Sequence, residues 1–325
     1  MRSKPALVAV LAAALAAATG CGDSEPEPAP AAASPGGDTA ITVAVMPIVE
    51  AAAVYVAQEQ GFFADAGLDV TIEEANTSSA IIPGLVSGQY DIGFSNLVTF
   101  LLADAQDLGL TAVAPASAPN PAGGEDMAAV IALDPDITTA ADLAGRTVGV
   151  NALNNIAAVS LHESVRAAGG DPGAVELVEL GFAEQLTALQ DGRIDAGFTV
   201  EPFLAVAAQS GAHAVSYPYL DVDPEIAISA YVATAESVEA DPAVADAFAA
   251  AVVRAAELIA SDPDVLFDAV GTFSDIDPAL YPELILCGFP TSLDPAAIQR
   301  WAELMVADGL IETAPDPRGL IRDGA

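Results

Sequence analysis

Short apolar runs alternate with longer mixed segments through most of the chain, and this alternation predicts an α/β fold. Residues 41–45, 68–72 and 92–94 are apolar or alternating runs of the length typical of buried strands. Residues 51–66 and 79–86 lie between these runs and have the composition of helices. Strands separated by helices favour parallel sheets built from right-handed crossovers.

An internal repeat indicates that this arrangement occurs twice. The pattern L-x-x-G-x-x-D-x-G-F runs from Leu85 to Phe94 and recurs from Leu189 to Phe198, 104 residues later. The apolar run at 43–45 has a counterpart at 148–150, at a spacing of 105. Several features in the same register favour a structural duplication over a chance match.

Two similar α/β units predict two lobes that face each other. Parallel sheets bind ligands beyond the carboxyl ends of their strands, so two such edges form a cleft. We expect lobe 1 over 40–130, lobe 2 over 131–230, and a helical return to lobe 1 over 231–325. The segments 128–133 and 228–233 are the expected connections between the lobes.

The beginning of the chain resembles a bacterial lipoprotein signal. A basic start and an apolar run at 6–18 precede small residues and Cys21. The run is too short to span a bilayer, which takes about 20 residues. Ala18 stands where the lipoprotein motif usually has Leu. We expect a signal peptide over 1–20, lipidation of Cys21, a disordered Pro-rich tether over 21–39, and an extracytoplasmic protein anchored to the cell membrane.

Charge and chemistry favour a binding protein over an enzyme. The chain has 46 acidic and 9 basic residues, a formal charge of −37, which disfavours nucleic-acid partners. Genome composition, a saline habitat or both account for this acidity. His162 and His213 are far apart, and we expect His162 to be a solvated helix residue. No catalytic motif, metal-ligand spacing or P-loop occurs, so we expect no catalytic residues, metal or cofactor.

Seven sequence motifs follow one another in an order that carries a family resemblance. They are QGFF at 60–63, GLDV at 67–70, GQYDIG at 88–93, DLAGRTVGV at 142–150, NALNN at 151–155, RIDAG at 193–197 and EPF at 201–203. With these motifs the chain resembles the substrate-binding proteins of ABC importers of the nitrate/sulfonate/taurine type, whose fold is shared with thiamine-pyrimidine synthases. The resemblance implies the periplasmic-binding-protein fold, with two hinge crossovers and a closing cleft. It also implies a monomer that delivers a small solute to an ABC permease and its ATPase.

Four places follow strand ends and are expected to line the cleft. The candidate ligand-binding residues are Glu50, Thr77, Ser78, Ser79, Asn96, Asn151, Asn154, Asn155 and Glu201. Helix starts offer free N–H groups to electron-rich ligand atoms. The alternative interpretations are an ordinary helix cap by Ser78 or Ser79, turn formation by the Asn residues, and a salt-bridged or solvated helix-start carboxylate at Glu201.

The nature of these residues constrains the solute. The repeat predicts that Asn96 and Glu201 lie on opposite lips of the cleft, and no Arg or Lys lies in the four places. A carboxylate favours an amine or amidine-like nitrogen, so a taurine-like aminosulfonate or an aminopyrimidine fits better than nitrate. The alternatives are an enzyme of the thiamine-pyrimidine synthase class, although Cys287 is isolated and expected to be a buried thiol, and a sensor domain for a partner receptor.

Overall fold

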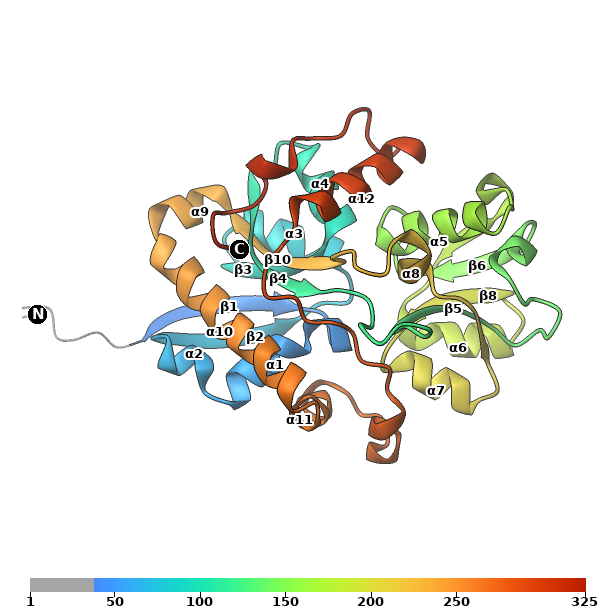
Figure 1. Cartoon of the computed structure of the whole chain (residues 1–325), viewed down its shortest axis with the longest axis horizontal. Helices are drawn as coiled ribbons and strands as arrows, with labels where there is room; N and C mark the ends of the chain where they lie inside the picture. The colour runs from blue at the N-terminus through green and yellow to red at the C-terminus, as the bar shows by residue number, and fades with distance from the viewer. Residues whose placement is uncertain (1–37) are drawn as a thin grey trace, which may run out of the picture. The chain divides into compact units, whose positions relative to one another are not determined.

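Two five-stranded sheets, each with an antiparallel strand in the fourth position, form the two lobes of the protein (Figure 1). The computed structural model describes residues 38–325. The first sheet has the order β2-β1-β3-β10-β4 and the second the order β7-β6-β8-β5-β9. The strands of the first are β1 (Thr39–Val45), β2 (Leu68–Glu74), β3 (Ile92–Asn96), β4 (Leu110–Ser117) and β10 (Ser229–Thr234). Those of the second are β5 (Ala128–Ala132), β6 (Thr147–Val150), β7 (Glu176–Glu179), β8 (Ala196–Val200) and β9 (His213–Ser216).

Helices connect these strands and cover the sheets. The α-helices are α1 (Ala52–Glu59), α2 (Phe62–Asp65), α3 (Ser78–Val86), α4 (Leu97–Asp104), α5 (Ile156–Ala167), α6 (Phe182–Gln190), α7 (Phe203–Gln209), α8 (Pro218–Val222), α9 (Ala235–Ala240), α10 (Pro242–Ser261), α11 (Asp264–Phe273) and α12 (Pro295–Ala307). The 3-10 helices are η1 (Val49–Ala51), η2 (Ala140–Leu143), η3 (Pro172–Ala174), η4 (Pro278–Glu283) and η5 (Pro317–Gly319). The single helix expected over 51–66 is divided at Gly61, whose φ of 70° is outside the helical range.

Each position of the repeat has the same structural role in both lobes. The side chain of Asp91 accepts a hydrogen bond from the backbone N–H of Thr42 at 2.7 Å, and that of Asp195 accepts one from Thr147 at 2.8 Å. Each carboxylate therefore joins its own loop to a neighbouring strand, β1 in the first lobe and β6 in the second. The structure confirms the duplication that the sequence indicates.

The second glycine of the repeat allows a helix to lie close to the sheet. A Cβ atom on Gly93 would lie 2.5 Å from Ile81 Cγ2 of α3, and one on Gly197 would lie 2.7 Å from Gln185 Oε1 of α6. No side chain fits these gaps without displacing its neighbours. Glycine at this position thus fixes the packing of α3 in the first lobe and of α6 in the second.

The chain passes between the lobes earlier than expected at both crossings. Residues 128–133 are mostly β5, which pairs antiparallel with β8 in the second sheet. Residues 228–233 fall mostly in β10, which pairs antiparallel with β3 and β4 in the first sheet. The connecting segments are instead 118–127 and 217–228, so the expected lobe boundaries at 130 and 230 move to the starts of β5 and β10. The apolar runs are buried because they are strands of a sheet, whereas the connections carry exposed polar residues such as Glu125 and Asp223.

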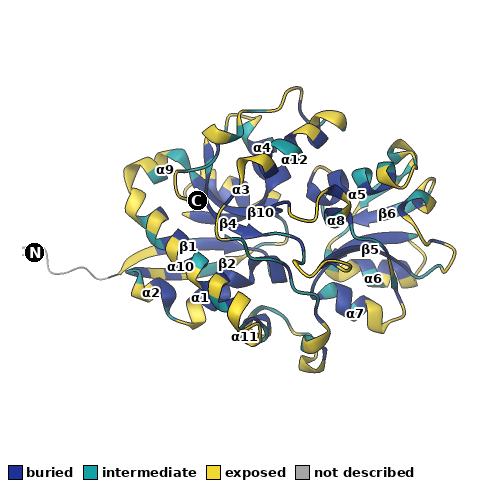
Figure 2. Cartoon of the chain, in the orientation of Figure 1, coloured by how far each residue is buried: buried dark blue, intermediate teal, exposed yellow. Residues whose placement is uncertain are grey.

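The cores of both lobes consist mainly of alanine, valine and leucine. Figure 2 shows buried residues along most of the strands and exposed residues on the outer faces of the helices. Among residues 38–325, no helix combines the length and the apolar character needed to cross a membrane. The expected signal peptide, Cys21 and all but the last two residues of the expected tether lie outside the described residues, and β1 already begins at Thr39.

Candidate functional site

A small cavity lies where the carboxyl ends of the central strands of both sheets meet. The first lobe lines it with Met46, Ile48, Glu50, Ser78, Phe94 and Asn96, and the second with Asn151, Asn155, Ile156, Ala157, Phe182, Phe198, Val200 and Tyr219. Its volume of about 20 Å³ is enough for one water molecule. This is the position that parallel α/β sheets use for ligands.

A larger pocket of about 440 Å³ adjoins this cavity. The two share Met46, Ile48, Asn151 and Phe182 in their walls. The larger pocket adds Pro47, Asn76, Thr77, residues 179–181, Ala183, Glu184 and Phe203. The rings of Phe182 and Phe203 lie 6.0 Å apart at an angle of 31°, which gives this pocket an aromatic wall. The cavity and the pocket therefore form a small inner space and a wider outer one.

Asn96 and Ser78 form the polar wall of the first lobe. Asn96 caps α4, because its Oδ1 accepts a hydrogen bond from the backbone N–H of Thr99 at 2.9 Å. Its backbone N–H and its Nδ2 donate to Ser78 Oγ at 3.2 and 3.3 Å. The amide nitrogen of Asn96 keeps one further hydrogen that is directed neither to the cap nor to Ser78.

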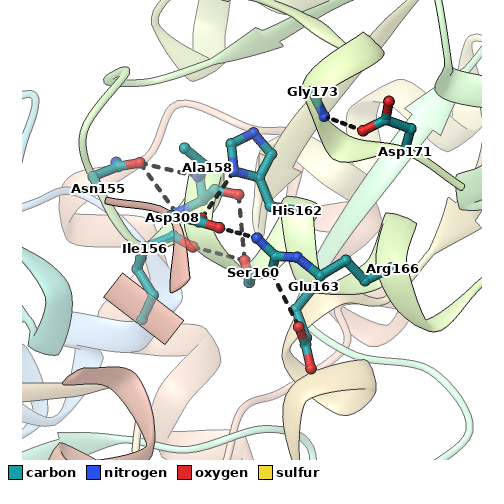
Figure 3. Close-up of polar contacts among 11 residues, drawn as sticks. Asn155, Ile156, Ala158, Ser160, His162, Glu163, Arg166, Asp171, Gly173 and Asp308 are labelled. Carbon is teal, nitrogen blue, oxygen red and sulfur yellow. Dashed lines mark hydrogen bonds and ion pairs between the residues drawn. The ribbon is translucent and has the colours of Figure 1, made fainter. Parts of the chain in front are cut away.

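Asn155 and Asn151 form the corresponding wall of the second lobe. Asn155 caps α5 by accepting from the backbone N–H groups of Ala157 and Ala158 at 3.1 and 3.4 Å (Figure 3). Its Nδ2 donates to Asn151 Oδ1 at 2.7 Å. An asparagine-capped helix thus begins at the cavity in each lobe, and both present side-chain amides to it.

Three other candidates, Thr77, Ser79 and Asn154, have different surroundings. Thr77 caps α3 by accepting from Ala80 N at 3.2 Å, and it lines the larger pocket. Ser79 and Asn154 line a separate groove between α3, α4 and residues 152–154. The structure therefore gathers Glu50, Ser78, Asn96, Asn151 and Asn155 around one cavity, and it does not bring Ser79 or Asn154 there.

Glu50 is a buried carboxyl without a hydrogen-bond partner for one of its oxygens. It is 4 % exposed, and Oε2 contacts no donor among the described residues. Burial, followed by the charge of Asp126, raises the pKa of Glu50 to about 8. The carboxyl is therefore mainly neutral at pH 7 and available to a donor that enters the cavity.

Asp126 is the charged neighbour of Glu50, and sequence analysis missed it. It is fully buried in the connection 118–127, and its Oδ1 accepts from the backbone N–H groups of Asn120 at 2.8 Å and Met127 at 2.9 Å. Its Oδ2 has no partner among the described residues. Burial raises its pKa to about 6, and the two N–H groups oppose this shift. In the sequence it follows Gly123, Gly124 and Glu125, a composition typical of an exposed turn.

Glu201 lies behind the cavity wall, bonded to the backbone. It is 1 % exposed, and its carboxylate accepts from Ala205 N at 3.1 Å and Ile285 N at 3.0 Å. Its carbonyl accepts from Val49 N of the first lobe at 3.3 Å. Burial raises its pKa to about 7, against the effect of the two N–H groups. Glu201 does not line the cavity, so its expected place on the lip opposite Asn96 is wrong, because backbone donors hold the carboxylate inside.

Aromatic rings complete the apolar side of the cavity, and sequence analysis did not single them out. Phe198 and Tyr219 meet edge to face at 5.7 Å, and Tyr219 meets Trp301 of α12 in the same way at 6.3 Å. Trp301 also donates from Nε1 to the carbonyl of Ala227 at 2.8 Å. The return connection between the lobes is therefore packed against α12.

Ion pairs join α5 of the second lobe to α12, which packs on α4 of the first (Figure 3). His162 Nδ1 lies 2.9 Å from Asp308 Oδ2, and Arg166 pairs with the other oxygen of Asp308. Glu163 accepts from Arg166 at 3.1 Å and from Arg300 at 2.9 Å. His162 is thus half-buried and paired, not solvated as expected. We refer to His162, Glu163, Arg166, Arg300 and Asp308 as the interlobe cluster.

Comparison with known proteins places this arrangement in a family. The family described as NMT1/THI5 like matches residues 49–265. The formylaminopyrimidine-binding protein of Halalkalibacterium halodurans is 30% identical over 227 residues, 68% of this chain and 66% of that protein. The match therefore spans just under two thirds of that relative's length.

Solved structures show the same fold. The periplasmic aliphatic sulphonate binding protein SsuA from Escherichia coli has a TM-score of 0.72 and 18% identity, covering 87% of this chain and 97% of SsuA. The periplasmic nitrate-binding protein NrtA from Synechocystis PCC 6803 has a TM-score of 0.72 and 14% identity, covering 88% and 86%. These likenesses confirm the periplasmic-binding-protein fold. With the match over residues 49–265, the chain belongs to the NMT1/THI5-like family.

Proposed function

We propose that this protein captures a small polar solute outside the cytoplasm and delivers it to an ABC permease and its ATPase. The observation that carries the proposal is the cavity to which both lobes contribute a capping asparagine, Asn96 and Asn155. Membership of a family with a formylaminopyrimidine-binding relative supports it. Lipidation at Cys21 would hold the protein beside its permease.

The geometry fits capture by closure of the two lobes. The inner cavity holds about one water molecule, so a solute enters only when the lobes are farther apart. A solute that contacts Asn96 in one lobe and Asn155 in the other binds the closed arrangement better than the open one. That difference in affinity shifts the population toward closure.

The chemistry of the walls favours a solute that carries N–H groups. None of the residues that line the cavity, among residues 38–325, is Arg or Lys. An anion would therefore depend on amide N–H groups and helix starts, and it would lie next to Glu50. An aminopyrimidine or a taurine-like aminosulfonate satisfies Glu50 and the asparagines together, and nitrate does not.

Burial of Cys287 supports binding over thiol chemistry. The thiol is 5 % exposed, and burial raises its pKa well above the usual value. Its Sγ lies 4.0 Å from the carbonyl of Val49, next to the loop that carries Glu50. A neutral buried thiol is a packing group.

A thermal-shift screen with aminopyrimidines, taurine, alkanesulfonates and nitrate tests the function. A solute at about 100 times its Kd adds about 2.7 kcal/mol to the free energy of unfolding. Asn151→Ala removes a cavity amide and should abolish the shift, whereas the control Asn154→Ala faces the separate groove and should retain it. Equal losses in both variants, or no shift with any of these solutes, would contradict the proposal.

A further inference from the structure

Two buried carboxyl groups near the cavity each have an oxygen without a partner. Glu50 belongs to η1 of the first lobe, and Asp126 belongs to the outgoing connection between the lobes. They contribute two of the four buried side-chain oxygens and nitrogens that lack a hydrogen bond among the described residues. Native proteins pair almost all such atoms, so this pair calls for a functional explanation.

No positive charge balances the pair among the described residues. The arginines that form ion pairs there all contact other carboxylates. The titratable groups around Glu50 are Asp126, Tyr219 and Cys287. β4, which packs against η1, contains no titratable residue. The titratable residues of α1 are Tyr55, which is hydrogen-bonded to Glu74, and Glu59, which lies beside Asp268. Two negative charges in this interior would be strongly unfavourable.

The hydrogen bonds indicate which group is neutral. Asp126 receives two backbone N–H groups, which stabilise its ionised form. Glu50 accepts no hydrogen bond from a described residue at Oε2 and lines the cavity. A proton on Glu50 therefore costs less than a proton on Asp126, and it faces the space that a solute enters.

We propose that Glu50 and Asp126 together hold one proton while the cavity is empty, and that a cationic nitrogen of the solute replaces this proton at Glu50. The inference rests on the proposed function. The cation enters, the proton leaves to water, and the net charge of the cavity is unchanged. Asp126 does not line the cavity and acts as a positioning residue, through its charge on Glu50.

Titration of the protein without solute tests the shared proton. Carboxyl carbons labelled with ¹³C report each Glu and Asp by NMR. We expect one glutamate to titrate near pH 8, absent in Glu50→Gln, with its midpoint moved toward acid in Asp126→Asn. The control Asp104→Asn removes another carboxyl of raised pKa, far from the cavity, and should leave that midpoint unchanged. A Glu50 that titrates in the ordinary range, or a midpoint that ignores Asp126→Asn, overturns the proposal.

Matched probes test the exchange. Taurine carries an ammonium group where isethionate carries a hydroxyl. Benzylamine and benzyl alcohol differ in the same way, and their ring is large enough to occupy the larger pocket. Calorimetry at pH 7 in phosphate and in Tris measures the protons released. We expect an amine to bind at least about tenfold tighter than its hydroxyl partner with close to one proton released, and Glu50→Gln to lose both effects.

Each result has a defined meaning. Amine binding without proton release, or preference for the hydroxyl probe, overturns the exchange. Failure of all four probes overturns it for amines of these sizes. The NMR titration still judges the shared proton in that case, and the wider solute screen judges the proposed function separately.

Discussion

The carboxylate of Glu201 accepts a hydrogen bond from the backbone N–H of Ile285 at 3.0 Å, across 84 residues of chain. The same carboxylate accepts from Ala205 N at 3.1 Å. Glu201 therefore connects the end of β8 to the chain that follows η4. Glu201, which the sequence suggests as a ligand contact, thus holds two distant segments together by hydrogen bonds.

Glu201→Gln should lower stability more than it lowers solute affinity. The amide replaces one acceptor oxygen with a donor and leaves one of two buried N–H groups unpaired, which costs about 1–3 kcal/mol. Thermal melting and calorimetric titration of the variant measure both effects. Glu184→Gln, at an exposed position of the larger pocket, is the control and should melt like the parent. An unchanged melting temperature together with a loss of solute binding would show that Glu201 contacts the solute.

Stability of the solute-free protein should fall as the pH rises from 5 to 8. The pKa of Glu50 is raised from 4.5 to about 8, that of Glu201 from 4.5 to about 7, and that of Asp126 from 3.8 to about 6. The folded protein thus binds protons more tightly than the unfolded chain. The stability that these carboxyl groups contribute is complete at pH values below their pKa in the unfolded chain. It is lost as the pH rises through their pKa in the folded protein.

Melting temperatures across this pH range provide the measurement. Each proton of difference contributes about 1.4 kcal/mol per pH unit. Glu50→Gln should flatten the upper part of the profile, between pH 7 and 8, because that carboxyl no longer titrates. A profile that rises toward pH 8 would contradict the burial of these three groups.

The interlobe cluster should favour closure. Arg300→Gln removes the pair with Glu163 across α5 and α12, and a solvent-accessible pair contributes about 0.2–1 kcal/mol. We expect a larger radius of gyration in small-angle scattering without solute, and non-additivity with Glu163→Gln in a double-mutant cycle. The control Arg254→Gln breaks a pair with Asp65 inside the first lobe and should not change the radius. Equal behaviour of the two variants would show that the cluster does not act on closure.

Alanine at the repeated glycine should be more harmful in the first lobe than in the second. At Gly93 the new Cβ would lie 2.5 Å from Ile81 and 3.1 Å from Leu85, both fixed in the core. At Gly197 its nearest neighbour is the amide end of Gln185, at 2.7 Å, which can move. Overpacking of a core costs about 1–3 kcal/mol, and we place Gly93→Ala at the upper end.

Chemical denaturation of the two variants measures this difference. Gly319→Ala serves as the control, because no atom lies within 4 Å of its added Cβ. A greater loss in Gly197→Ala would show that Gln185 is held more rigidly than its flexible side chain suggests.

Local requirements of the backbone explain what the sequence predicted well. The repeat was visible because Asp91 and Asp195 must bond a neighbouring strand and Gly93 and Gly197 must admit a helix. The predicted connections between the lobes were wrong because the apolar run at 128–133 does not indicate which sheet it joins. Strand order is a property of tertiary packing.

The site was predictable only where it follows strand ends. Asn96 and Asn155 lie at the cavity because each caps a helix that begins there. Their contact with a solute stays a prediction. Asp126 was missed because its burial depends on the chain folding over a polar turn, and Tyr219 because it reaches the cavity from the return connection. The hydrogen bond from Ile285 N to the Glu201 carboxylate joins residues that are 84 positions apart, so it depends on the tertiary fold.

The order of strands along the chain also sets an order of assembly. The second sheet is made entirely from the continuous segment that begins with β5 and ends with β9, so all its strands leave the ribosome before β10 does. In the first sheet β4 meets β3 only through β10, which is synthesised after the whole second lobe. During synthesis the second lobe can therefore complete its sheet while β4 of the first lobe is still unpaired. An arrested chain that ends before Ser229 should contain one protease-resistant lobe, and extension past Thr234 should protect the other.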